Sequence, residues 1–136
     1  VGLDVGYKTI GIAVSDRSLT IATPINTVAR KGTKKDFSKI KEYLSEYEIG
    51  GFIIGLPLSL NGNENEQTKK MRKFSIELQI FFSIPTEFWD ERYSSDIIFK
   101  EMKRSDYSYS KIKKKLDQQS AAYILQGYLD KYRNTF

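Results

Sequence analysis

The chain has 136 residues, the usual length of one domain, and its net charge of +5 suits a polyanionic partner such as nucleic acid. It contains no cysteine and no histidine, so disulfides, zinc–thiolate sites, cysteine nucleophiles and histidine bases are excluded. Any metal must therefore be bound by oxygen atoms, which favours Mg²⁺ or Mn²⁺ over Zn²⁺.

No segment has the length and apolar character of a membrane span, and no signal peptide is visible. We therefore expect a cytoplasmic protein without a membrane partner. Because the chain begins at Val1 rather than Met, the alternative is an organellar protein with a targeting segment ahead of Val1. For the oligomeric state we expect a monomer or a weak homodimer.

The first part of the chain predicts three strands in an antiparallel meander. Apolar residues alternate over 1–5 and again over 10–14, on either side of a turn at 6–8. Residues 21–28 predict the third strand, in which Pro24 indicates a sheet edge or a strand start.

A helix and a buried strand are predicted next. After a polar connection at 31–35, residues 36–47 carry apolar side chains at the spacing of an amphipathic helix, which Gly50 and Gly51 would end. The apolar run 52–54 is typical of a strand that is buried on both faces.

The second half predicts three helices and one strand. A loop at 55–65 precedes a helix, and residues 85–89 form the fifth strand. A third helix follows, and a polar loop at 105–110 separates it from the last helix at 116–132. The apolar faces consist of Met71, Phe74, Leu78 and Phe81 in the second helix, Ile97, Ile98 and Met102 in the third, and Ala121, Leu125, Leu129 and Tyr132 in the last.

This order of elements predicts an α/β fold. We expect a five-stranded mixed sheet, with the first three strands antiparallel, flanked by helices on both faces. Because no internal repeat or second domain is visible, residues 1–136 are expected to form a single domain.

Acidic residues on three elements are candidates for metal-dependent chemistry. Asp4 lies in an apolar strand, where a charge is costly to bury unless a metal or partner holds it; the structural alternative is a cap on the turn at Gly6. Asp90 and Glu91 follow the fifth strand, at the end where sites gather in open sheets. Because side chains alternate along a strand, only one of this pair would reach a metal, and the alternative is an exposed turn.

The third candidate position is Asp117, which opens the last predicted helix, where an acid ordinarily complements the helix dipole. It shares a helical face with Ala121 and Leu125, so packing of that face on the sheet would direct Asp117 toward Asp4. Carboxylates gathered in this way repel one another unless cations neutralise them. We expect catalytic roles for Asp4, Asp90, Glu91 and Asp117, with Asp4, Asp90 and Asp117 binding about two Mg²⁺ or Mn²⁺ ions.

Basic and polar side chains around the same end of the sheet would contact phosphates. A glycine at the first bend permits close approach of the backbone, and the loop after the fourth strand frames the site. For the lysines at 111–115, the alternative is a solvated start of the last helix. The predicted nucleic-acid contacts are Lys8, Ser59, Asn61, Arg92, Lys113 and Lys114.

Four segments of the chain resemble the YqgF family, also called RuvX, of the RNase H-like superfamily. They are Leu3–Gly11 (LDVGYKTIG), Gly55–Gly62 (GLPLSLNG), Asp90–Ser94 (DERYS) and Leu116–Ala122 (LDQQSAA). Each is weakly specific alone, but their joint order and spacing extend over nearly the whole chain.

The resemblance implies an RNase H-like sheet and a Mg²⁺- or Mn²⁺-dependent nuclease, a hydrolase that acts on ester bonds. Family members are linked to trimming the 5′ end of precursor 16S ribosomal RNA in ribosome biogenesis, and some are described as Holliday junction resolvases. Structured RNA is thus the expected substrate and branched DNA the alternative. The family's acids carry over onto Asp4, Asp90 or Glu91, and Asp117. RuvC-type enzymes also use an acid on the fourth strand, where residues 55–57 of this chain have none.

Two other classes of function fit parts of the sequence. Residues 2–11 also resemble the first phosphate loop of actin-like and sugar-kinase ATPases, but those enzymes need two related domains that close on ATP. A non-catalytic RNA-binding factor in ribosome assembly, with its acids kept for structure, fits the same composition.

Overall fold

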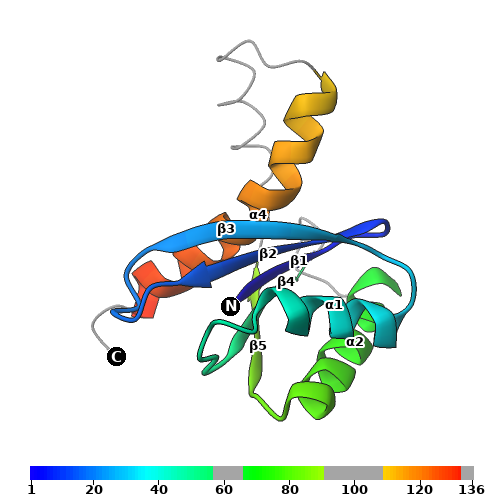
Figure 1. Ribbon diagram of the computed structural model, residues 1–136, viewed down its shortest axis with the longest axis horizontal. Helices are drawn as coiled ribbons and strands as arrows, with labels where there is room; N and C mark the ends of the chain where they lie inside the picture. Colours follow the sequence, from blue (N-terminus) through cyan, green and yellow to red (C-terminus); the bar gives the residue numbers. More distant parts are fainter. Residues whose placement is uncertain (57–65, 91–108, 133–136) are drawn as a thin grey trace.

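The computed structural model describes residues 1–56, 66–90 and 109–132; for residue 90 and residues 109–118 it describes the backbone alone. Its centre is a mixed five-stranded sheet with the order β3-β2-β1-β4-β5 (Figure 1). The strands are β1 (Gly2–Val5), β2 (Thr9–Ser15), β3 (Ala22–Ala29), β4 (Phe52–Leu56) and β5 (Thr86–Asp90). The pairs β1–β2 and β2–β3 are antiparallel, whereas β4 pairs in parallel with both β1 and β5. The predicted mixed α/β sheet is confirmed.

Helices cover both faces of this sheet (Figure 1). On one face α1 (Thr33–Tyr43) and α2 (Glu66–Phe82) pack over a core that includes Leu3 and Phe52. On the other face α4 (Tyr109–Tyr132) crosses the sheet and forms a second core with Ala13, Ile53 and Leu125. The strand β4 is buried along its whole length and supplies both cores, as its apolar sequence predicts.

The predicted bounds of the first helix are wrong at both ends. α1 begins at Thr33, because its N-cap residue Gly32 has a non-helical backbone conformation with a φ of 145°, which glycine adopts readily. It ends at Tyr43, with Leu44 as its C-cap, so Tyr47 lies outside the helix and is 43% exposed. The Gly50–Gly51 pair therefore does not end this helix.

Other bounds also differ from the prediction. β4 continues to Leu56, two residues into the predicted loop, and α4 begins at Tyr109, inside the predicted polar loop. Phe81 is 41% exposed, and Phe82 packs against the core instead. β3 lies at an edge of the sheet, as Pro24 indicates. The predicted helix with Ile97, Ile98 and Met102 lies outside the described residues.

Close packing of β1 on α4 depends on Gly2. A Cβ atom at this position would lie 2.7 Å from the Leu125 Cβ atom and 2.8 Å from the Ala121 carbonyl oxygen. We expect Gly2→Ala to lower the free energy of unfolding by roughly 1–3 kcal/mol, because backbone must move to relieve this overlap. Gly50→Ala is the matched control, since its Cβ would meet nothing within 4 Å. Equal urea midpoints for the two variants would contradict the expected packing.

Candidate functional site

Three parallel strands, β1, β4 and β5, end at the same edge of the sheet (Figure 1). The registers pair Leu3 with Ile54 and Leu56 with Asp90. Continuing the first register by one residue sets Asp4 beside Gly55, which in turn pairs with Trp89. The backbones of two predicted site residues, Asp4 and Asp90, thus lie at one edge, on strands separated by β4.

The half-buried Asp4 lies on the face of the sheet that α4 covers. Gly2 contacts α4 closely, and residues two apart on a strand share a face, so Asp4 follows Gly2 on this side. The turn after it is closed by backbone, because the Gly6 N–H donates to the Thr9 carbonyl oxygen at 2.8 Å.

The third predicted carboxylate position, Asp117, lies on α4, one helical turn before Ala121, which packs against Gly2. Its side chain is not described, and the same holds for Lys113, Lys114 and Asp90. Ser59, Asn61, Glu91 and Arg92 lie outside the described residues. Among the described side chains no group of three potential metal-binding residues occurs, and Asp4 is the one predicted acid in that set.

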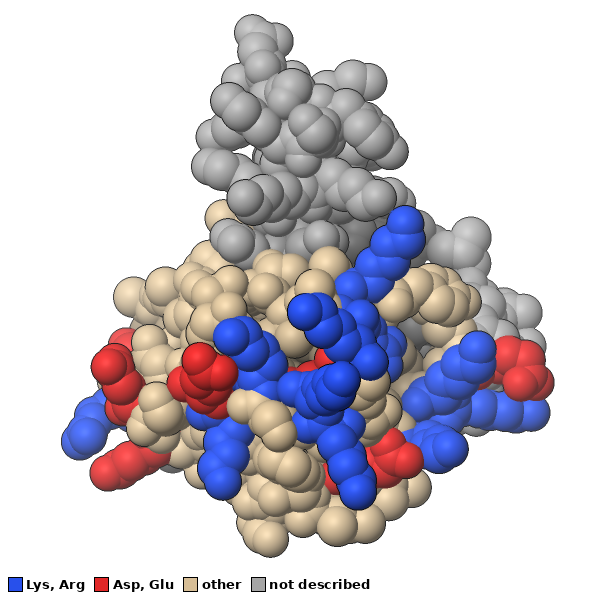
Figure 2. Space-filling view, turned by 45° about the vertical axis from the view of Figure 1, so that its right-hand side comes forward, with Lys and Arg blue, Asp and Glu red and all other residues tan. Residues whose placement is uncertain are grey.

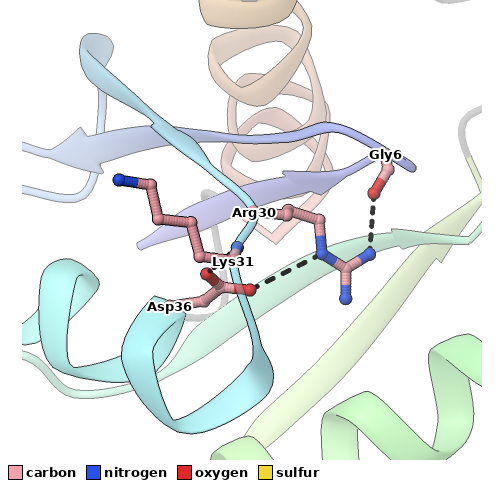
Figure 3. Close-up of polar contacts among 4 residues, drawn as sticks. All are labelled: Gly6, Arg30, Lys31 and Asp36. Atoms are coloured by element: carbon pink, nitrogen blue, oxygen red, sulfur yellow. Dashed lines mark hydrogen bonds and ion pairs between the residues drawn. The ribbon is translucent and has the colours of Figure 1, made fainter.

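The turn that follows Asp4 is held by Arg30, a residue for which the sequence predicts no role (Figure 3). Its Nη1 atom donates to the Gly6 carbonyl oxygen at 2.7 Å, and its backbone N–H donates to the Lys8 carbonyl oxygen at 2.8 Å. Its guanidinium also lies 5.7 Å from the centre of the Phe74 ring. Arg30 thus fixes the turn that presents the exposed Lys8.

The buried carboxylate of Asp36 orients Arg30 from the first turn of α1 (Figure 3). The Asp36 Oδ2 atom lies 3.7 Å from the Arg30 Nε atom, and Oδ1 accepts the backbone N–H of Lys31 at 2.8 Å. A lone Asp at a helix start ordinarily indicates only an interaction with the helix dipole, so the sequence pattern did not reveal this contact. The signal that could have found it is the Arg30-Lys31 pair just ahead of Asp36.

Another acid near a strand end, Asp16, has a structural role. Its carboxylate accepts backbone N–H groups of Thr20 and Ile21 and the hydroxyl of Ser18. The Thr20 N–H is the main reason that the pKa of Asp16 lies below its usual value, followed by the Ser18 hydroxyl. Asp16 closes the turn between β2 and β3, at the opposite end of the sheet from the edge where β1 ends.

The family model described as "RuvX: Holliday junction resolvase" matches residues 1–131. The chain belongs to this family. A protein of Thermoanaerobacter pseudethanolicus named "Putative pre-16S rRNA nuclease" is 44% identical over 135 residues, which cover 98% of this chain and 97% of that protein. A Clostridium kluyveri protein with the same name is 39% identical over 131 residues, which cover 96% of each chain. RuvX is thus a family of nucleases, which act on nucleic acid.

Solved structures agree with this RuvX assignment at the level of the fold. RuvC of T. thermophilus, in complex with a Holliday junction substrate, matches with a TM-score of 0.55 at 14% identity, over 98% of this chain and 94% of that one. A second structure of Thermus thermophilus RuvC matches with a TM-score of 0.51 at 12% identity. The predicted RNase H-like fold is confirmed. No helix among the described residues could cross a membrane.

Proposed function

We propose that this RuvX-family protein is a metal-dependent nuclease that trims the 5′ end of precursor 16S ribosomal RNA. The observation that carries the proposal is the position of Asp4, a half-buried carboxylate on the α4 face, at the edge where three parallel strands end. The names of the relatives support precursor 16S RNA as the substrate. The family description supports a four-way DNA junction as the alternative.

The donor set fits Mg²⁺ or Mn²⁺. The chain offers no histidine or cysteine, and the proposed ligands Asp4, Asp90 or Glu91, and Asp117 are carboxylates, which these hard cations prefer. Partial burial of Asp4 strengthens its interaction with a cation relative to bulk water. Bound there, about two such ions would lower the pKa of water and neutralise charge on the phosphate.

The protein's own groups would position the substrate. Lys8 sits on a turn that Arg30 holds through the Gly6 carbonyl oxygen, so its ammonium is available to a phosphate beside Asp4. We propose the same phosphate-binding role for Ser59, Asn61, Arg92, Lys113 and Lys114. Their charged, hydroxyl or amide groups would hold the backbone of the nucleic acid, while Asp4 would hold the metal at the phosphate that is cut.

For the acid contributed after β5, we propose Glu91 rather than Asp90. Phe88 packs in the core under α1 and α2, and Trp89 packs in the core under α4, so consecutive positions alternate between the faces. Asp4 lies on the same face of the sheet as Trp89, so the acid on that face would be Glu91 if the alternation of β5 continued one residue past Asp90. We expect Glu91→Gln to lower the cleavage rate more than Asp90→Asn; the reverse order would assign the role to Asp90.

Cleavage of two substrates side by side tests the proposed function. One is a precursor 16S RNA fragment that spans the mature 5′ end, and the other is a synthetic four-way DNA junction, each with Mg²⁺ and with Mn²⁺. We expect metal-dependent cleavage of the RNA at or near the mature end. Cleavage of the junction alone would favour the resolvase, and RNA binding without cleavage of either substrate would favour an assembly factor.

A further inference from the structure

Positive charge is concentrated in three segments of the chain. Lys8, residues 30–43 and residues 66–73 together contain 11 of the 22 Lys and Arg residues but only three of the 17 Asp and Glu residues. These segments therefore have a net charge of +8, the remainder has −3, and the whole chain has +5. Besides the lysines at 111–115, the basic excess therefore lies on and beside α1 and the first half of α2.

All three acids in these segments form ion pairs within them. They pair as Asp36 with Arg30 at 3.7 Å, Glu42 with Lys39 at 3.5 Å, and Glu66 with Lys69 at 3.5 Å. The three acids therefore pair with Arg30, Lys39 and Lys69, and none of these ion pairs involves the lysines that define the surface below. We define the cationic surface as the exposed side chains of Lys8, Lys31, Lys34, Lys35, Lys70 and Lys73.

The three segments meet in space through Arg30. Its hydrogen bonds reach the β1–β2 turn, its ion pair reaches α1, and its guanidinium packs over Phe74 of α2. The turn and the starts of α1 and α2 lie on the right-hand side of Figure 1. Figure 2 brings this side forward and shows that Lys and Arg dominate the middle of the face. The surface therefore begins at the turn after Asp4 and continues over the two helices.

The helix dipole does not explain these positions. Lys34 and Lys35 lie in the first turn of α1, where the partial positive charge of the helix end disfavours a cation. A polyanion bound across the surface would offset this repulsion. The lysines are spread over the surface, and a nucleic-acid backbone with regularly spaced phosphates fits such a spread better than one compact anion does.

We propose that the cationic surface binds the backbone of RNA that flanks the cleavage site, as a second contact area outside the carboxylate edge. This inference rests on the proposed nuclease function and extends it to a region that carries none of the predicted site residues except Lys8. Its contacts are with phosphates, so they add affinity without sequence preference.

The test compares two double variants that remove the same charge. Lys34→Gln/Lys35→Gln alters the cationic surface, and Arg17→Gln/Lys131→Gln alters described cations elsewhere. Binding to the precursor 16S RNA fragment is measured by fluorescence anisotropy between 50 and 200 mM salt, without divalent metal so that RNA is not cut. For the first variant we expect affinity to fall about tenfold and the salt slope to fall by about 2. The control should match the wild type, and melting curves should show that both variants fold.

Each other outcome overturns the proposal in a recognisable way. Equal losses in both variants would mean that only net charge matters. Unchanged RNA binding by the Lys34→Gln/Lys35→Gln variant would show that the cationic surface does not bind RNA. The proposed nuclease function would still stand if the wild type cleaves the same RNA. Binding to phosphatidylserine vesicles is measured in parallel. If the Lys34→Gln/Lys35→Gln variant loses vesicle binding but keeps RNA binding, the surface binds membranes instead. A wild type that neither binds nor cuts the RNA would defeat the nuclease function and this inference together.

Discussion

Replacing Asp4 by asparagine is expected to lower the rate of metal-dependent RNA cleavage by about a thousandfold, which corresponds to about 4 kcal/mol of lost transition-state stabilisation. Asparagine keeps the size of the side chain but removes the charge that a divalent cation requires. Because asparagine has nearly the same shape as aspartate, the fold and the affinity for RNA should be retained. Single-turnover cleavage and melting curves measure the two properties separately.

The matched control for Asp4 is Glu46→Gln, which removes an exposed carboxylate between α1 and β4, at the opposite end of the sheet from the edge where β4 ends. It should cleave RNA at the wild-type rate. If Asp4→Asn also cleaves at that rate while remaining folded, Asp4 is not a metal ligand. If it fails to fold, the carboxylate has the structural role that its position in an apolar strand equally permits.

The second large effect is expected at Asp36. Its side chain is 2% exposed, and Asp36→Ala would leave the Lys31 N–H without its acceptor and the Arg30 guanidinium without its ion-pair partner. Because Asp36 is buried while Arg30 is 27% exposed, urea unfolding should show a loss of about 2 kcal/mol, between the values for a surface pair and a buried pair. The turn that presents Lys8 should also become less ordered, because Arg30 holds the Gly6 carbonyl oxygen.

Glu42→Ala is the control for this effect, since it breaks an exposed ion pair with Lys39 on the same helix. Pairs of this kind contribute little, and we expect a change below about 1 kcal/mol. Similar losses in the two variants would show that the Arg30–Asp36 contact is no stronger than a surface pair.

Periodicity is sufficient to predict the order of the described elements because most of their buried residues follow the apolar spacing. The apolar run in β4 and the edge position of Pro24 both reflect physical constraints on strands that act locally. The ends of α1 were not predictable in the same way. Its start depends on the positive φ of Gly32, and its end comes before the glycine pair that the pattern favours.

The candidate site could be predicted in part, because the carboxyl ends of parallel strands lie at one edge of a sheet whatever the conformation of the loops that follow them. This rule sets the backbones of Asp4 and Asp90 at one edge. The role of Arg30 could not be predicted, since it depends on contacts between a turn, a helix start and α2 that are far apart in the sequence. The choice between Asp90 and Glu91 depends on where strand alternation ends, which composition does not determine.

Binding of Mn²⁺ to the full chain, followed by electron paramagnetic resonance, tests the central claim most directly because it needs no substrate. The free ion gives a sharp six-line signal that broadens when protein carboxylates bind it. We predict that the wild type depletes the free signal and that Asp4→Asn does so at least about tenfold more weakly, while Glu46→Gln matches the wild type. Equal depletion by the wild type and Asp4→Asn would contradict a metal site built on Asp4.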